Sequence, residues 1–194
     1  GYGPTGHFQG GERTPPDALH VQHLLADCQK AGVERLAMAV SSHALQQNRC
    51  QTVQFDAAIY TNLSRDHLDY HADFEEYFSA KAGLFDRVLP EDATAVINID
   101  DAWGARMAEV VDSRGQDLLT VGRDDMAALR IIGQRFDQTG QEMRFEWGGK
   151  IFQVRLGLIG GFQAENALVA AGLCIATGAE PDETFDALHT LETV

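Results

Sequence analysis

Apolar side chains recur three or four positions apart along residues 15–32, a spacing that gathers them on one side of an α-helix. Prolines stand at the start of this stretch and Gly32 at its end, as is common for helices. Similar patterns predict further helices over 73–87, 101–111, 162–178 and 181–191. Asp73 and Glu76 also have the spacing of a capping box, which favours a helix start at that point.

Short apolar runs lie between these helices and predict buried strands at 35–40, 55–61, 94–99 and 118–122. Strands that alternate with helices indicate a mainly parallel sheet with helices on both faces. The pattern changes over 128–160, where turn signals at 138–140 and 148–149 predict about three antiparallel strands. The predicted fold class is therefore α/β, with a mainly parallel sheet flanked by helices and a small antiparallel subsheet.

Composition narrows the possible functions. The 194 residues fit one domain of ordinary size. No apolar run approaches the roughly 20 residues that span a bilayer, and no signal peptide opens the chain, so we expect a cytoplasmic protein without membrane insertion. The net charge of −14 argues against nucleic-acid binding. Cys28, Cys50 and Cys174 form no CxxC pair, which indicates reduced thiols.

The stretch TNLSRDHLDYHADFEEYFSAKAGLF, residues 61–85, holds the candidate chemistry. If residues 66–71 form a helical turn, His67 and His71 share one face and could bind a metal. They follow a predicted strand, where open α/β sheets bind ligands. The alternative is that they are polar residues that hydrogen-bond nearby loops. Lys81 stands between two alanines on a predicted helix, and spacing alone indicates only a lysine whose head reaches solvent.

The same stretch strongly resembles the signature of the central, ATP-binding domain of the Mur ligase family. Four other segments resemble motifs of that family, namely TPPDAL (14–19), MAVSSHALQQNR (38–49), INIDD (97–101) and GGFQAENALVAA (160–171). The resemblance covers nearly the whole chain. It implies that residues 1–194 are one partial central domain. The strand with the P-loop, the N-terminal UDP-binding domain and the C-terminal amino-acid-binding domain would lie outside this sequence.

This resemblance also implies a reaction. The Mur ligases build the peptide stem of bacterial peptidoglycan, and the sequence is most similar to the members that add the third amino acid. In that reaction ATP phosphorylates a carboxylate to an acyl-phosphate, and the amine of the incoming amino acid then displaces phosphate. The implied partners are UDP-N-acetylmuramoyl-dipeptide and an amino acid, and the implied cofactors are ATP and Mg²⁺.

The resemblance further assigns roles to individual residues. Lys81 would be the catalytic residue, N-carboxylated so that its carbamate helps hold a Mg²⁺ that bridges to the ATP γ-phosphate. His67 would be a second ligand of that ion, and Asn166 would lie near the adenine. Four residues would contact the UDP-sugar peptide: Thr14, Ser41, Gln47 and Arg49.

The sequence departs from the family pattern at several of these positions. No segment has the form G-x-x-x-x-G-K-[ST], which in P-loops cradles the phosphates. Ala39 stands where the family has a magnesium-binding glutamate, Pro15 replaces a threonine, and Gln163 replaces the first asparagine of the adenine-site helix. We therefore expect a ligase as the parent protein and an inactive isolated chain. Two alternatives stay open: a non-catalytic binding fragment or degenerate homologue, or a related folylpolyglutamate or cyanophycin-type ligase.

Overall fold

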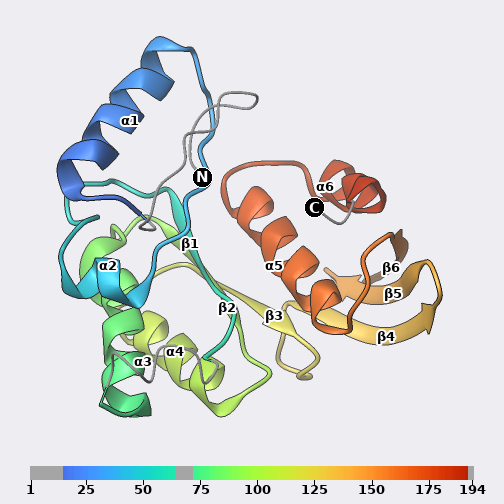
Figure 1. Cartoon of the computed structure of the whole chain (residues 1–194). Coiled ribbons are helices and arrows are strands. Elements are labelled where there is room, and N and C mark those ends of the chain that lie inside the picture. Colours follow the sequence, from blue (N-terminus) through green and yellow to red (C-terminus); the bar gives the residue numbers. More distant parts are fainter. Residues whose placement is uncertain (1–14, 64–71, 192–194) are drawn as a thin grey trace. The chain divides into compact units, whose positions relative to one another are not determined.

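The computed structural model describes residues 15–63 and 72–191 of the chain (Figure 1). The chain divides into two compact units, the first formed by 1–54 with 66–88 and the second by 55–65 with 89–194. None of the helices in the described ranges is long and apolar enough to cross a membrane.

The first unit is helical in its described part. It contains α1 (Ala18–Lys30), α2 (Ser42–Gln46), α3 (Phe74–Gly83) and the π-helical turn η1 (Leu84–Val88). The predicted helices over 15–32 and 73–87 are confirmed. The carboxylate of Asp73 accepts a hydrogen bond from the backbone N–H of Glu76 at 2.8 Å, which caps α3 as the spacing of these two residues predicted.

The second unit is built on one six-stranded sheet in the order β1-β2-β3-β4-β5-β6. Its strands are β1 (Ala57–Tyr60), β2 (Thr94–Asn98), β3 (Leu118–Gly122), β4 (Leu129–Asp137), β5 (Gly140–Trp147) and β6 (Lys150–Leu156). Strands β1 to β4 pair in parallel and β4 to β6 pair antiparallel. The predicted fold class is confirmed.

Helices cover both faces of the parallel strands. Helix α4 (Ala102–Ser113) and helix α5 (Phe162–Ala176) lie on opposite faces of β1–β3 (Figure 1). Ala95, Val96 and Ile97 of β2 are all fully buried, as expected for a strand with no solvent-facing side. Gly172 lets α5 approach closely, because a Cβ there would lie 2.9 Å from Cγ1 of Val96.

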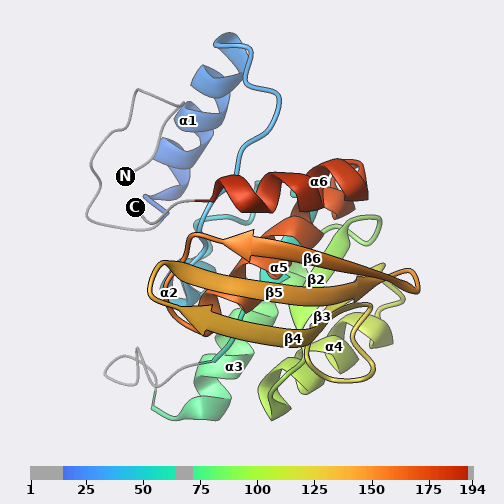
Figure 2. The ribbon, with the colours of Figure 1, turned by 90° about the vertical axis from the view of Figure 1, so that its right-hand side faces the viewer.

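The antiparallel strands β4, β5 and β6 lie side by side, with α6 (Pro181–Ala187) and the 3₁₀ turn η2 (Leu188–Thr190) next to β6 (Figure 2). Phe185 of α6 packs against Phe145 and Phe152, at 4.9 and 4.8 Å between ring centroids. The turn between β5 and β6 is Gly148–Gly149, with φ of 56° and 77°, values that glycine adopts without strain. Both predicted turns are confirmed.

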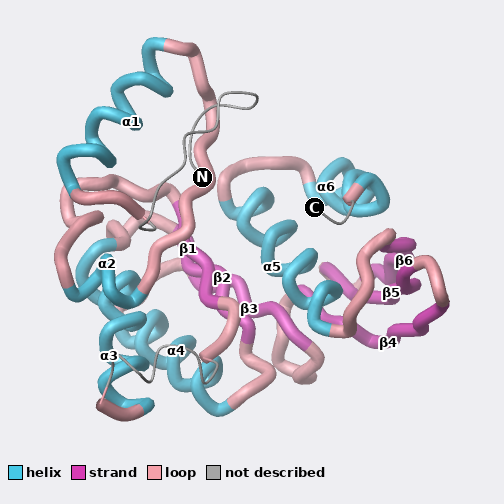
Figure 3. Tube along the Cα trace, viewed as in Figure 1, coloured by secondary structure: helices cyan, strands magenta, loops and turns pink. Residues whose placement is uncertain are grey.

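One strand prediction is wrong. Residues 35–40 were predicted as a buried strand, but the structure shows them as loop between α1 and α2, and their side chains are exposed or half-buried (Figure 3). A short apolar run gives a strand only where a neighbouring strand supplies hydrogen bonds, and within the described ranges this segment pairs with none. Helix α2 follows this loop and was not predicted.

A β-bulge interrupts the pairing of β4 with β5. Ile131 pairs with Phe145 and Gly133 pairs with Arg144, so Ile132 is an extra residue on β4. Beyond the bulge, Gln134 pairs with Met143. Because Met143 and Phe145 are buried on the same face of the sheet, the bulge turns the side chain of Gln134 to that face.

Candidate functional site

The predicted site residues fall in both units. Ser41, Gln47, Arg49 and Lys81 belong to the first unit, and Asn166 belongs to the second. The other two predicted residues, Thr14 and His67, lie outside the described ranges.

Ser41 and Gln47 lie at the two ends of α2. Ser41 is the N-cap, and its hydroxyl accepts a hydrogen bond from the backbone N–H of Ala44 at 3.2 Å. Gln47 is the C-cap residue, and its backbone N–H donates to the carbonyl of His43 at 2.9 Å. A helix of only five residues is marginal without such end contacts. The two predicted substrate residues thus have a local structural role as well.

Arg49 is the most constrained of the predicted substrate residues. Its exposed fraction is 9%, which is low for an arginine. Nε donates to Oε1 of Gln47 at 3.0 Å, and the Nη2 group donates to the same oxygen. Nη1 donates to the carbonyl oxygen of Pro15 at 3.0 Å. Arg49 therefore ties the end of α2 to the segment that follows Thr14 and brings two of the predicted substrate residues, Gln47 and Arg49 itself, together with Pro15.

Cys50 lies next to Arg49 and is fully buried. Burial raises the pKa of its thiol, because the thiolate loses solvation, and the nearby Arg49 charge opposes this effect only in part. A buried thiol with a raised pKa is a poor nucleophile. Cys50 is therefore part of the core beneath Arg49.

Lys81 is half-buried on α3, between the buried Ala80 and Ala82. Its Nζ lies 4.8 Å from the ring centroid of Tyr77, a cation–π contact with a ring that is itself buried. Among the residues the structure describes, no group of three His, Cys, Asp or Glu could hold a metal ion. An unmodified ammonium at Lys81 would repel Mg²⁺, so these residues fit that ion only if Lys81 is converted to a carbamate.

In the second unit, Asn166 lies exposed near the start of α5. Its Nδ2 is 3.4 Å from Oε1 of Gln163, which lies one turn earlier on the same helix. The helix begins after Gly161, which has no side chain to cap it. The N–H groups of the first turn therefore receive no side-chain cap from that residue.

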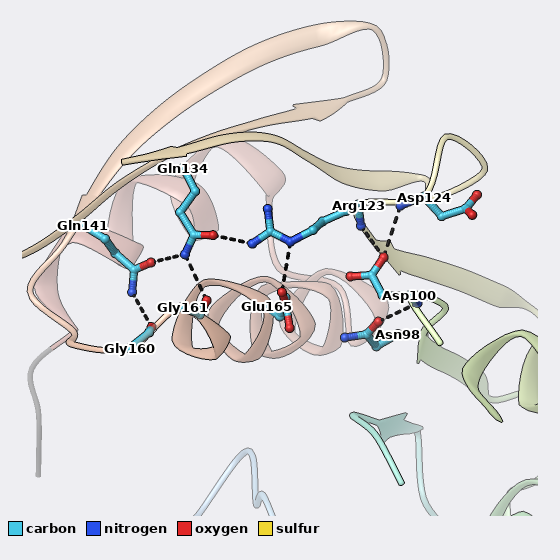
Figure 4. Close-up of polar contacts among 9 residues, drawn as sticks. All are labelled: Asn98, Asp100, Arg123, Asp124, Gln134, Gln141, Gly160, Gly161 and Glu165. Carbon is cyan, nitrogen blue, oxygen red and sulfur yellow. Dashed lines mark hydrogen bonds and ion pairs between the residues drawn. The ribbon is translucent and has the colours of Figure 1, made fainter. Parts of the chain in front are cut away.

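A polar cluster that no sequence motif indicated surrounds this helix start (Figure 4). Asp100 follows β2, and its carboxylate accepts hydrogen bonds from the backbone N–H groups of Arg123 and Asp124, the second at 3.1 Å. Arg123 follows β3, and its Nε donates to Oε1 of Glu165 on α5 at 3.1 Å. The signal that could have found these residues is their place directly after two parallel strands, where open α/β sheets bind ligands.

A mainly parallel sheet with polar side chains after β2 and β3, and an uncapped helix start beside them, is the arrangement of a ligand-binding α/β domain. Residues 3–174 match the family model described as the Mur ligase middle domain. The chain belongs to the Mur ligase family, and this match covers most of its length.

Individual relatives agree with the family assignment. The chain is 39% identical over 188 residues to a UDP-N-acetylmuramoyl-L-alanyl-D-glutamate–2,6-diaminopimelate ligase of Rhizobium meliloti (strain 1021). That match covers 96% of this chain and 38% of the relative, so the chain spans well under half of that protein. A solved structure of a ligase with the same description superimposes with a TM-score of 0.84 at 31% identity, over 92% of this chain and 37% of that one.

A third comparison concerns the fold alone. The MurF ligase from Thermotoga maritima, solved in complex with ADP, is similar to this chain with a TM-score of 0.64 and 22% identity. The similarity covers 75% of this chain and 32% of that one.

Proposed function

We propose that this chain is the nucleotide-binding middle domain of an ATP-dependent ligase that adds the third amino acid to UDP-N-acetylmuramoyl-dipeptide. The observation that carries the proposal is the 39% identity to a 2,6-diaminopimelate ligase over 96% of the chain. We propose that the parent protein of this chain adds the amino acid that the relative's name gives, 2,6-diaminopimelate. The fold shared with a ligase that holds ADP supports a nucleotide site in the second unit.

The proposed reaction forms an amide bond in two steps. The substrate carboxylate attacks the γ-phosphorus of ATP, which releases ADP and leaves an acyl-phosphate. The amine of the amino acid then attacks the acyl carbon, the C–O bond to phosphate breaks, and the amine loses a proton. Asn166, with Gln163 beside it, would contact the adenine. Their amide groups supply both donors and acceptors, which the edge of a purine base requires.

The first unit would contact the UDP-sugar peptide through Thr14, Ser41, Gln47 and Arg49. The buried Arg49 supports this assignment because its guanidinium fixes Gln47 and the carbonyl of Pro15 in one place. A preorganised group of this kind orders fewer side chains when a ligand binds. Arg49 would thus act mainly by holding the loop that begins at Thr14.

We propose that Lys81 is N-carboxylated, with CO₂ adding to its neutral amine and a proton leaving. The carbamate and His67 would then help hold a Mg²⁺, which when bound neutralises charge on the transferred phosphoryl group. The small buried neighbours Ala80 and Ala82 support the presence of space for the added group. The test is ¹³C NMR of the chain in ¹³C-bicarbonate, where wild type should give a carbamate signal that Lys81→Arg lacks. Lys30→Arg is the matched control, because Lys30 is an exposed helical lysine.

For the chain by itself, a non-catalytic role is the second candidate. Ala39 cannot ligate a metal, and the sequence holds no G-x-x-x-x-G-K-[ST] segment, so we propose that the isolated chain does not catalyse ligation. Ala39 is exposed, so a glutamate fits there without repacking. If loss of this carboxylate weakens metal binding, Ala39→Glu should tighten Mg²⁺-ATP binding by about tenfold, the effect of one added favourable contact of about 1.4 kcal/mol.

The deciding experiment is calorimetry with UDP-N-acetylmuramoyl-dipeptide and, separately, with Mg²⁺-ATP. We expect weak binding of either ligand to the isolated chain. Micromolar ATP binding that Lys81→Ala abolishes would favour a catalytic chain over the non-catalytic alternative. Binding of a folate or a cyanophycin-type peptide in place of the UDP-peptide would contradict the proposed substrate.

A further inference from the structure

A network of hydrogen-bonded polar side chains lies beside α5 and takes no part in the reaction proposed above (Figure 4). It begins at Arg123, whose Nη2 group donates to Oε1 of Gln134 on β4. Nε2 of Gln134 donates to Oε1 of Gln141 on β5 and, at 2.9 Å, to the carbonyl of Gly161. Nε2 of Gln141 donates to the carbonyls of Leu158 and Gly160, both at 3.0 Å.

The hydrogen bonds among Arg123, Gln134 and Gln141 can run in only one direction. Gln141 is fully buried and faces two carbonyl oxygens, so its NH₂ group must point to them. Its own oxygen then needs a donor, which is the NH₂ group of Gln134, and the oxygen of Gln134 in turn meets Arg123. Because arginine only donates, the sequence of donors and acceptors is fixed from end to end. Successive bonds aligned in this way polarise and strengthen one another.

Two features of the backbone position Gln134 and Arg123 in this network. The bulge at Ile132 turns Gln134 to the buried face of the sheet. At the other end, the carboxylate of Asp100 accepts from the backbone N–H of Arg123 and lies against Gly122, where any Cβ would meet it at 2.3 Å. A side chain at Gly122 would displace Asp100 and with it the loop that carries Arg123.

The groups held by these hydrogen bonds lie in the segment just before α5 or in its first turn. Gln134 and Gln141 bind the carbonyls of residues 158, 160 and 161, and Arg123 also binds Glu165 in the first turns of the helix. Gly161 gives the helix no side-chain cap, and these bonds to backbone carbonyls instead hold the segment from which the helix begins. The first turn carries Gln163, and Asn166 follows one turn later.

We propose that Arg123 is a positioning residue for base recognition. Through Glu165, and through Gln134 and Gln141, it fixes the first two turns of α5 so that Gln163 and Asn166 present their amides in one orientation to the adenine. This inference rests on the proposed function, since it assigns the adenine to those two residues. Arg123 itself does not contact the base in this arrangement.

The test combines ligand-observed NMR of adenosine and guanosine with amide hydrogen exchange over 162–166, both on the 194-residue chain. Arg123→Met removes the charge and both side-chain bonds. Gln134→Glu keeps a partner for Arg123 but places a carboxylate oxygen against Oε1 of Gln141 and the carbonyl of Gly161. Arg135→Met is the matched control, because Arg135 is exposed on the same strand. Arg123→Lys tests whether a positive charge retained at this position preserves base recognition.

We expect Arg123→Met and Gln134→Glu to speed exchange over 162–166 by about tenfold and to reduce adenosine affinity by a similar factor. The preference for adenosine over guanosine should be lost, and Arg123→Lys should recover part of it. Arg135→Met should match wild type. A purely structural role would weaken both nucleosides equally, and that result would overturn the proposal.

Failure of the proposed function gives a different result. If the wild-type chain binds neither nucleoside, the nucleotide site itself is contradicted, and hydrogen exchange alone decides the role of Arg123. Faster exchange in Arg123→Met but not in Arg135→Met would then support only the fixing of the helix start, and the role in base recognition would be overturned together with the nucleotide site. Equal exchange in wild type and Arg123→Met would overturn the fixing of the helix start as well.

Discussion

Arg49 in the first unit and Arg123 in the second both bind a glutamine amide oxygen and lie beside predicted site residues, but their surroundings differ. Arg49 is 9% exposed and holds a backbone carbonyl and its near neighbour Gln47. The side chain of Arg123 is 41% exposed and binds groups from α5 and β4. Water can replace the partners of an exposed arginine but not those of a buried one. Removal of Arg49 should therefore cost stability, and removal of Arg123 should chiefly change local geometry.

The largest effect is expected at Gln141, the buried end of the hydrogen-bonded network that begins at Arg123. Gln141→Leu leaves the buried carbonyl of Leu158 and the part-buried carbonyl of Gly160 without their donor, so the free energy of unfolding should fall by about 3 kcal/mol. Chemical denaturation measures this, with the exposed Gln138→Leu as control. A cost for Gln141→Leu no larger than that of the control would show that these carbonyls have other partners.

Arg49→Met tests the buried side of the comparison directly. The variant keeps most of the apolar volume but removes the donors to Gln47 and Pro15, so we expect a loss of about 2 kcal/mol in the free energy of unfolding. Arg123→Met should lose less than about 1 kcal/mol, because its ion pair with Glu165 is partly exposed to solvent. Equal losses for the two variants would contradict the distinction drawn between the arginines.

Thiol reactivity gives a local measure of the Arg49 region. Cys174 is exposed and should react first with a thiol reagent at neutral pH, while the buried Cys28 and Cys50 react slowly. Arg49→Met should speed the reaction of Cys50 by about tenfold, because local opening becomes easier, and leave Cys174 unchanged. Labelling followed by peptide mass spectrometry distinguishes the three sites. Acceleration of all three thiols would indicate global rather than local unfolding.

The smallest effect concerns the antiparallel hairpin of β4 and β5. The Arg155 guanidinium and the hydroxyl and N–H of Thr139 hold the pKa of the Asp137 carboxyl well below its usual range. A carboxyl whose pKa is lowered in the folded state stabilises the protein above its unfolded pKa, and this contribution is lost as pH falls through the folded pKa. The melting temperature of wild type should therefore fall more below about pH 4 than that of Asp137→Asn. Parallel curves would show that this pair does not contribute.

The sequence predicted the elements whose signals are local. Periodicity gave the helices other than α2 and most strands, and the glycines at 148–149 gave the turn between β5 and β6. The segment 35–40 failed because its apolar residues indicate a strand only if a partner strand exists. The polar cluster was missed because its members come from separate elements. Arg123 and Glu165, for example, are 42 positions apart, and each alone resembles an ordinary surface residue.

The residues of the candidate site were found by resemblance to family motifs, not by periodicity. Ser41, Gln47 and Arg49 were assigned by resemblance, and the structure places all three at or just after α2. Gly133 inside β4 was an available sign of the bulge that turns Gln134 inward, since an isolated glycine in a strand often marks one. The direction of the hydrogen bonds among the glutamines could not be predicted, because it depends on which carbonyls the fold brings near them.

The extra residue at Ile132 makes the length of β4 as informative as its composition. Side chains alternate sides along a strand, so β4 at its present length keeps Gln134 opposite Met143 only because the bulge takes up Ile132. If the same residues paired without the bulge, Arg135 would point into the core and Gln134 to solvent, and no single substitution could restore both. A related sequence one residue shorter at this point needs no bulge and should align its inward glutamine with Gln134 and a gap with Ile132, which allows alignments to be checked at a single column.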